Sequence, residues 1–233
     1  MKMKEVIIEE NLCISNNIIG TDKLWPHSYV NGFYQQEFEK IREQPISLLE
    51  IGFRHGASLY LWSRFFSNVQ ILGLDNGSDV SVTNESPVNN VWLDQENIKT
   101  RVGDAYDEKF SKGVLEKFDV IIDDGPHSLE SQIKFLNLYL DKLKPGGVAI
   151  IEDLQRYGGI LLWPLLLNTP LSYEVEFYDF RKKNGLKDDM LYVVRNTGDK
   201  IILSRMKLIL RAVGYTLYDP IRIIFMKFTN KGR

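Results

Sequence analysis

The segment FDVIIDDGPHS, residues 118–128, places two carboxylates and an imidazole directly after a mostly apolar run. Carboxylate oxygens accept hydrogen bonds and bind hard cations, and imidazole exchanges a proton near neutral pH. His127 follows Asp124 by three residues, in the turn expected after the strand. The combination indicates acid–base chemistry, and the alternative is a histidine that only bonds to the backbone where a helix begins.

Alternating apolar runs and amphipathic segments are expected to position these residues. Short apolar runs predict strands over residues 46–52, 69–75, 98–105, 118–124 and 147–153. Helical spacing predicts helices over residues 57–66, 107–117 and 128–143. Residues 172–180 and 189–196 predict a closing hairpin. The fold class is therefore α/β, with a doubly wound, mostly parallel, seven-stranded Rossmann-like sheet and an antiparallel terminal hairpin.

Acidic residues end all five predicted parallel strands. Ligands of open α/β sheets bind outside the carboxyl ends of the strands, so these acids predict one electronegative rim there. Capping of the following helices is the alternative interpretation. The rim would consist of Glu50, Asp75, Asp104, Asp123, Asp124, Glu152 and Asp153.

The first strand-to-helix turn, EIGFRHGAS, carries two glycines that let a ligand approach the backbone. It lacks a complete G-x-G-x-x-G pattern, which disfavours the pyrophosphate of a nicotinamide dinucleotide. Asp75 lies 23 residues after Gly52, where a carboxylate can accept hydrogen bonds from ribose hydroxyls. Dinucleotide and nucleoside cofactors both need such an acceptor, so Asp75 alone does not choose between them.

Composition narrows the class of protein. With 233 residues and 44% hydrophobic content, the chain can bury a sizeable core. A net charge of −2 gives no general footprint for nucleic acid, and the single cysteine, Cys13, excludes an internal disulfide framework. No apolar run reaches 18 residues, and the N-terminal segment lacks the apolar region of a signal peptide. These features predict a cytoplasmic protein.

Several motifs resemble those of class I S-adenosylmethionine-dependent methyltransferases: LLEIGFRHGASL, ILGLD, VGDA, FDVIIDDGPHS and LKPGGVAIIEDL. The upstream segment GTDKLWPHSY, residues 20–29, is similar to a T-D-K…H-x-Y signature of bacterial sugar and macrolide-sugar O-methyltransferases. The resemblance covers residues 20–196. It implies S-adenosylmethionine and a divalent metal, usually Mg²⁺, as cofactors, and methylation of a sugar hydroxyl on a small-molecule or glycan acceptor.

The same resemblance implies Asp124 and Asp153 as metal ligands and His127 as general base. The pKa of a sugar hydroxyl lies far above neutrality, so a Lewis acid and a base would both ease loss of its proton. Glu37 is the candidate third ligand. Direct alignment places Tyr34 at that position, so Glu37 requires a local shift, and water is the alternative.

The cofactor is expected to lie along the predicted rim. Glu50 and Asp75 would bond its ribose and amino-acid region, and Asp104 its adenine amine. A lid against its methionine end or the acceptor would be formed by Thr21, Asp22, Lys23, His27 and Tyr29. The alternative is that Lys23 is only solvated and Tyr29 packs in the core. The expected cofactor-binding residues are Thr21, Lys23, Glu50, Gly52, Gly56, Asp75, Asp104 and Asp123.

Three regions are predicted along the chain: a lid or substrate segment over residues 1–44, the cofactor-binding domain over residues 45–198, and a basic amphipathic extension over residues 199–233. The extension carries eight Lys and Arg against two Asp. It could dock on the acidic body of its own chain, on a second subunit of a homo-oligomer, or on an anionic membrane surface as a peripheral contact.

Two other function classes stay open at this stage. One is an NAD-type Rossmann oxidoreductase, and the other is a cofactor-binding module without catalysis. A hydroxylase with two histidines and one carboxylate on iron is disfavoured, because only His27, His55 and His127 exist and none is paired in sequence.

Overall fold

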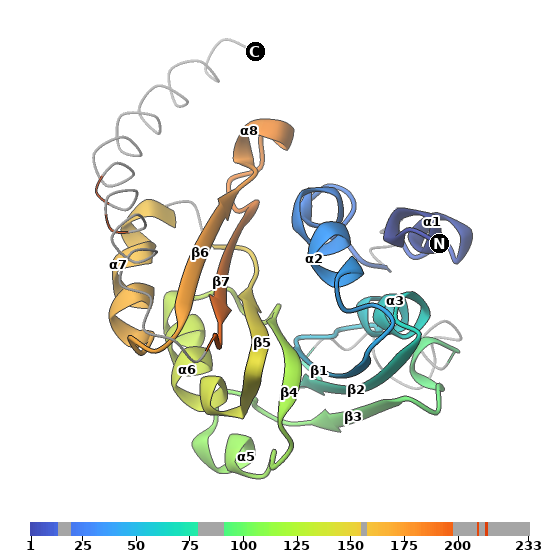
Figure 1. Ribbon diagram of the computed structural model, residues 1–233, viewed down its shortest axis with the longest axis horizontal. Helices are drawn as coiled ribbons and strands as arrows, with labels where there is room; N and C mark the ends of the chain where they lie inside the picture. Colours follow the sequence, from blue (N-terminus) through green and yellow to red (C-terminus); the bar gives the residue numbers. More distant parts are fainter. Residues whose placement is uncertain (14–19, 79–90, 155–157, 198–208, 210–212, 214–233) are drawn as a thin grey trace.

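A seven-stranded sheet with strand order β3-β2-β1-β4-β5-β7-β6 forms the centre of the protein (Figure 1). The computed structural model describes residues 1–13, 20–78, 91–154, 158–197, 209 and 213. Strands β1 to β5 run parallel, and β7 runs antiparallel to both β5 and β6. This confirms the predicted fold class. The strands are β1 (Pro45–Ile51), β2 (Asn68–Asp75), β3 (Ile98–Val102), β4 (Phe118–Asp123), β5 (Leu143–Ile151), β6 (Glu174–Asp179) and β7 (Met190–Arg195).

Helices cover both faces of the sheet because its central strands are apolar on both sides (Figure 1). Leu48 of β1 packs in one hydrophobic core and its neighbour Leu49 in the other, as the alternation of side chains along a strand requires. The first core is closed by α1 (Met3–Glu9), the π-helical turn η1 (Val30–Tyr34), α2 (Gln35–Glu39) and α3 (Ala57–Phe65). The second is closed by α6 (Leu129–Tyr139) and α7 (Gly158–Asn168). The remaining short elements are α5 (Glu108–Lys112), η3 (Leu140–Lys142) and α8 (Arg181–Asn184).

Among the predicted helices, two end well before the predicted residue. The helix predicted over residues 107–117 is the shorter α5, which ends just before Gly113, a residue that is unfavourable in helices. The helix predicted over residues 128–143 ends earlier, and β5 already begins at Leu143, which pairs with Phe118. Backbone bonds from Asn196 to Gly147 and from Gly146 to Asn196 hold the glycines of LKPGG against the segment after β7.

The register of three neighbouring strands places the chemically interesting residues side by side. Asp123 of β4 lies between Ile51 of β1 and Ile151 of β5. Asp124 therefore leaves the sheet next to Gly52 on one side and next to Glu152 and Asp153 on the other. The fourth and fifth predicted strands are thus neighbours in the sheet.

The N-terminal residues pack on the sheet as part of its first helical layer. Met3, Tyr29 and Phe38 are buried in the same core as Leu48. In the described part of the chain, no helix combines the length and the apolar character needed to cross a membrane. The predicted basic extension, residues 199–233, lies outside the described residues except for residues 209 and 213.

Candidate active site

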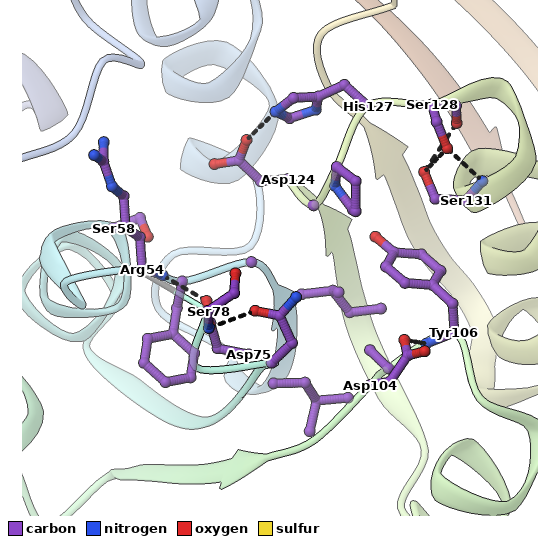
Figure 2. A pocket seen from close by; sticks show the side chains of 18 of the residues that line it. Arg54, Ser58, Asp75, Ser78, Asp104, Tyr106, Asp124, His127, Ser128 and Ser131 are labelled. Atoms are coloured by element: carbon purple, nitrogen blue, oxygen red, sulfur yellow. Dashed lines mark hydrogen bonds and ion pairs between the residues drawn. The ribbon is translucent and has the colours of Figure 1, made fainter. Parts of the chain in front are cut away.

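A cavity of about 690 Å³ opens at the carboxyl ends of the parallel strands (Figure 2). Loops that follow β1, β2, β3 and β4 form its walls, together with the start of α6 and residues 20–22. Of the residues predicted to bind a cofactor, four line this cavity: Thr21, Gly52, Asp75 and Asp104. Figure 2 shows Asp75 and Asp104 at one end of the cavity, and Asp124 with His127 at the other.

Backbone groups fix the two carboxylates at the far end of the cavity. Asp75 accepts hydrogen bonds from the amides of Arg54 at 2.9 Å and Gly77 at 2.8 Å. Asp104 accepts one from the amide of Tyr106 at 2.9 Å. These bonds hold both side chains on the cavity wall, where a ligand can reach them.

Gly52 lets the loops after β1 and β4 come together. Its φ of +85° is in the left-handed region, and a Cβ atom there would lie 2.1 Å from the carbonyl oxygen of Asp124. Gly56 has the same φ, but a Cβ atom there would meet Leu93, and Gly56 does not line the cavity. The two glycines are therefore needed for loop packing, and only Gly52 borders the cavity.

Asp124, His127 and Asp153 converge beside this cavity. One potential ligand atom from each lies within 4.8 Å of the others. Nε2 of His127 is 3.9 Å from Oδ1 of Asp124 and 3.6 Å from Oδ2 of Asp153. His127 and Asp153 have φ values of 56° and 52°, a strained conformation for residues other than glycine, of a kind that is concentrated at functional sites.

Burial and the neighbouring charge of Asp124 raise the pKa of Asp153 to about 6. A cation bound between the two carboxylates would offset this repulsion. Two carboxylate oxygens on neighbouring strand ends are a suitable donor set for Mg²⁺ or Mn²⁺.

Lys23 lies behind this group, and its ammonium joins the ends of three strands. Its Nζ is 2.7 Å from Oδ2 of Asp124, 2.6 Å from Oε2 of Glu152 and 3.5 Å from Oε1 of Glu50. Burial lowers the pKa of Lys23, but the three carboxylates outweigh it and raise the pKa well above its ordinary value. Lys23 is fully buried and does not line the cavity, so the structure does not place it where the predicted contact with cofactor would occur.

Residues 49–154 match a protein family described as a methyltransferase domain. This part of the chain is a methyltransferase domain. It is 30% identical over 143 residues to the 8-demethyl-8-alpha-L-rhamnosyl tetracenomycin-C 2'-O-methyltransferase of Streptomyces olivaceus, covering 58% of this chain and 35% of that protein. It is 33% identical over 132 residues to the mycinamicin VI 2''-O-methyltransferase of Micromonospora griseorubida, covering 52% of this chain and 30% of that protein. The matched region thus spans about a third of these relatives.

Solved structures share the fold of this methyltransferase domain. The MycE methyltransferase from the mycinamycin biosynthetic pathway, in complex with Mg, SAH and mycinamycin VI, superimposes with a TM-score of 0.60 at 21% identity. That match covers 87% of this chain and 57% of the other. An O-methyltransferase from Bacillus cereus in complex with SAH gives a TM-score of 0.54 at 16% identity, over 83% of this chain and 88% of the other.

Glu37, the predicted third metal ligand, is not part of the group formed by Asp124, His127 and Asp153. Its carboxylate accepts hydrogen bonds from Arg195 of β7 and from Lys40, the latter at 2.8 Å. Both basic partners lower the pKa of Glu37 against the opposing effect of burial. Tyr34, the residue that direct alignment placed at this position, is the one that points inward, and its hydroxyl donates to Glu152.

Only some acids of the predicted rim face the cavity, and the others are buried. Glu50, Asp123 and Glu152 are each at most 2% exposed and do not line the cavity of the methyltransferase domain. Glu50 accepts a hydrogen bond from the indole of Trp62 at 2.7 Å in addition to its ion pair with Lys23. Side-chain alternation accounts for the division, because consecutive acids at a strand end point in different directions.

A second acidic group near the site is better explained as an ion-pair cluster. Asp22, His27 and Asp153 also lie close enough to hold a metal. Burial lowers the pKa of His27, but Asp189, Asp153 and Asp22 raise it to about 9. The imidazole is then positively charged at neutral pH, and this cation balances the charge of the surrounding carboxylates.

Tyr106 is a cavity residue that was not predicted from the sequence. It lines the cavity, and its hydroxyl donates to Asp123. An aromatic residue two positions after Asp104 gives no signal of such a contact, because the partner lies 17 residues away, at the end of β4.

Asp123 should make the stability of the methyltransferase domain depend on pH. Burial raises the pKa of Asp123 to about 7 from an ordinary value of 3.8, although the bond from Tyr106 favours the ionised form. The native state therefore holds a proton that the unfolded state has lost, and the free energy of unfolding falls as pH rises from about 4 to 7. Asp123→Asn should remove this component, worth at most about 3 kcal/mol between pH 4.5 and 7.5. Urea unfolding of both proteins at the two pH values measures this difference in the free energy of unfolding. An equal change with pH in the wild-type protein and in Asp123→Asn would refute a raised pKa for Asp123.

Proposed function

We propose that this protein is an S-adenosylmethionine-dependent O-methyltransferase that methylates a sugar hydroxyl of a small-molecule or glycan acceptor, assisted by a divalent cation. The observation that supports it best is the convergence of Asp124, His127 and Asp153 beside a cavity at the carboxyl ends of the strands. A methyltransferase domain has its cofactor at this edge of the sheet, and the three side chains supply acid–base and cation-binding chemistry next to it.

When bound, S-adenosylmethionine would supply an electrophilic methyl group, and a divalent cation would polarise the acceptor hydroxyl. Asp75 and Asp104 offer hydrogen-bond acceptors on the cavity wall that suit ribose hydroxyls and an adenine amine. Gly52 and Thr21, which also line the cavity, complete this part of the proposed cofactor site.

His127 is the proposed general base. Its Nε2 would accept the proton that the acceptor hydroxyl loses as the new carbon–oxygen bond forms. Oδ1 of Asp124 and Oδ2 of Asp153 lie 3.9 Å and 3.6 Å from this nitrogen, so the base would stand beside a hydroxyl that is polarised by a cation on these two acids. His127 acts in this way only if Nε2 is free to take a proton, so we assign it no role as a metal ligand.

Asp124 and Asp153 are the proposed cation ligands. Each has one carboxylate oxygen held by a buried donor, Lys23 or Tyr29, and the other oxygen near His127. Magnesium commonly binds through one or two carboxylates and keeps several water molecules, so two protein ligands suffice. Glu37, bonded to Arg195 and Lys40, is left out of this set.

The proposed acceptor class rests on the named relatives. They are named for O-methylation of a rhamnosyl tetracenomycin and of mycinamicin VI. The present chain matches about a third of their length, so the acceptor is part of the proposal and does not follow from the match alone.

Methyl-labelled S-adenosylmethionine and a panel of rhamnosides and macrolide glycosides test the function. We expect labelled glycoside to form in the presence of Mg²⁺, and calorimetry to show binding of S-adenosylhomocysteine. Binding of NAD⁺ without binding of S-adenosylhomocysteine would reject the proposal in favour of an oxidoreductase. Binding of S-adenosylhomocysteine with no transfer to any hydroxylated acceptor would leave only a cofactor-binding module.

A further inference from the structure

We infer that Tyr29 and Lys23 form a supporting layer for the cation site, and that Tyr29 is a positioning residue that fixes Asp153. The inference rests on the proposed function, because it concerns how that site would hold its cation. It gives residues 21–29 a role different from the lid expected from the sequence.

The Tyr29 hydroxyl binds both the side chain and the backbone amide of Asp153. The Tyr29 hydroxyl donates to Oδ1 of Asp153 at 2.5 Å and accepts a hydrogen bond from the Asp153 amide at 3.3 Å. Tyr29 itself is fully buried, and its ring stacks on that of His27 with centroids 4.9 Å apart. One rigid, enclosed hydroxyl thus holds the carboxylate of a residue whose φ of 52° is strained.

Lys23 likewise holds one carboxylate oxygen of Asp124. Its ammonium binds Oδ2 at 2.7 Å, and Oδ1 lies 3.9 Å from His127. In both acids, therefore, one oxygen is bound by a buried donor from residues 21–29 and the other lies near the imidazole. Carboxylates held in this way keep one orientation, so little freedom is lost when a cation binds to the outer oxygens.

Tyr29 and Lys23 are not placed to contact a ligand in the cavity. Both side chains are fully buried, and neither lines the cavity. Their effect on the reaction must therefore pass through Asp153 and Asp124. Loss of a partner behind a metal ligand typically weakens metal binding about 10- to 100-fold.

Tyr29→Phe in the full chain is the decisive variant. It removes the hydroxyl, keeps the ring packing against His27, and changes no formal charge, so the Coulomb attraction for a cation is preserved. Lys23 is less suitable, because its replacement would remove a positive charge and strengthen that attraction. Mn²⁺ titration followed by electron paramagnetic resonance, at fixed pH with S-adenosylhomocysteine present, should show affinity at least about 10-fold weaker than in the wild-type protein. Affinity for S-adenosylhomocysteine should stay within about twofold, because Tyr29 does not border the cavity.

Tyr34→Phe is the matched control. Tyr34 is equally buried and donates its hydroxyl to Glu152, the residue next to Asp153. Its Mn²⁺ affinity should equal that of the wild-type protein. Wild-type affinity in Tyr29→Phe, or an equal loss in both variants, would overturn the inference. A wild-type protein that binds S-adenosylhomocysteine but no Mn²⁺ would instead remove the cation from the proposed function, and the inference with it.

Discussion

His127→Asn should lower turnover by about 10²- to 10⁴-fold, the usual contribution of a positioned general base. The amide of asparagine cannot take up the hydroxyl proton at neutral pH. Asparagine tolerates the left-handed conformation that His127 adopts, with φ of 56°, so the turn after β4 should keep its shape. Initial rates at saturating S-adenosylmethionine and acceptor measure the loss.

Affinity for S-adenosylhomocysteine serves as the control for this variant. It should change less than about threefold, which corresponds to under 1 kcal/mol, because the acids that would bind the nucleoside lie at the other end of the cavity (Figure 2). Turnover within threefold of the wild-type rate would exclude His127 from proton transfer, whatever the cofactor affinity.

Asp124→Asn should abolish the response of the reaction to added Mg²⁺ and lower the rate by roughly 100-fold or more, since a polarising metal contributes several kcal/mol. The substitution removes the ligand charge. The asparagine oxygen would accept the hydrogen bond from the Lys23 ammonium, so the amide NH₂, a donor that cannot ligate a cation, would take the place of the outer carboxylate oxygen. Rates are measured over a Mg²⁺ titration after treatment with chelator.

Asp119→Asn is the matched control for the metal experiment. Asp119 lies on the same strand, β4, and bonds Lys144 and the amide of Ser47, each at 2.8 Å. It should keep the wild-type dependence on Mg²⁺. Full wild-type activity after complete chelation would show that the reaction needs no divalent cation and would discard this part of the proposal.

The strands were predictable because their residues are apolar over short, bounded runs, which are typical of buried parallel strands. The end of α6 and the start of β5 were not predictable. They depend on the pairing of Leu143 with Phe118 and on the bonds of Asn196 with the glycine pair, and these partners are distant in sequence. The sequence predicted a helix up to residue 143 and a strand from residue 147, whereas β5 already begins at Leu143.

The candidate site was likewise predictable only where it depends on the strand order. Adjacent strands were enough to predict that Asp124 and Asp153 would lie together, because strand ends in a parallel sheet share an edge. The partners of the carboxylates were not predictable. Lys23 reaches Glu152 across 129 residues of sequence, and Glu37 is held by Arg195 across 158. Such contacts decide which acid is paired with a basic residue and which one faces the cavity. A short motif in one sequence carries no information about these distant partners.

Crystals grown with Mn²⁺ and S-adenosylhomocysteine allow the most direct test, because anomalous diffraction locates the manganese ion. We expect one peak in contact with Oδ1 of Asp124 and Oδ2 of Asp153, the His127 ring beside it but not bound, and the nucleoside between Asp75 and Asp104. Bound S-adenosylhomocysteine with no manganese between those two carboxylates, or with His127 turned away from them, would contradict this expectation.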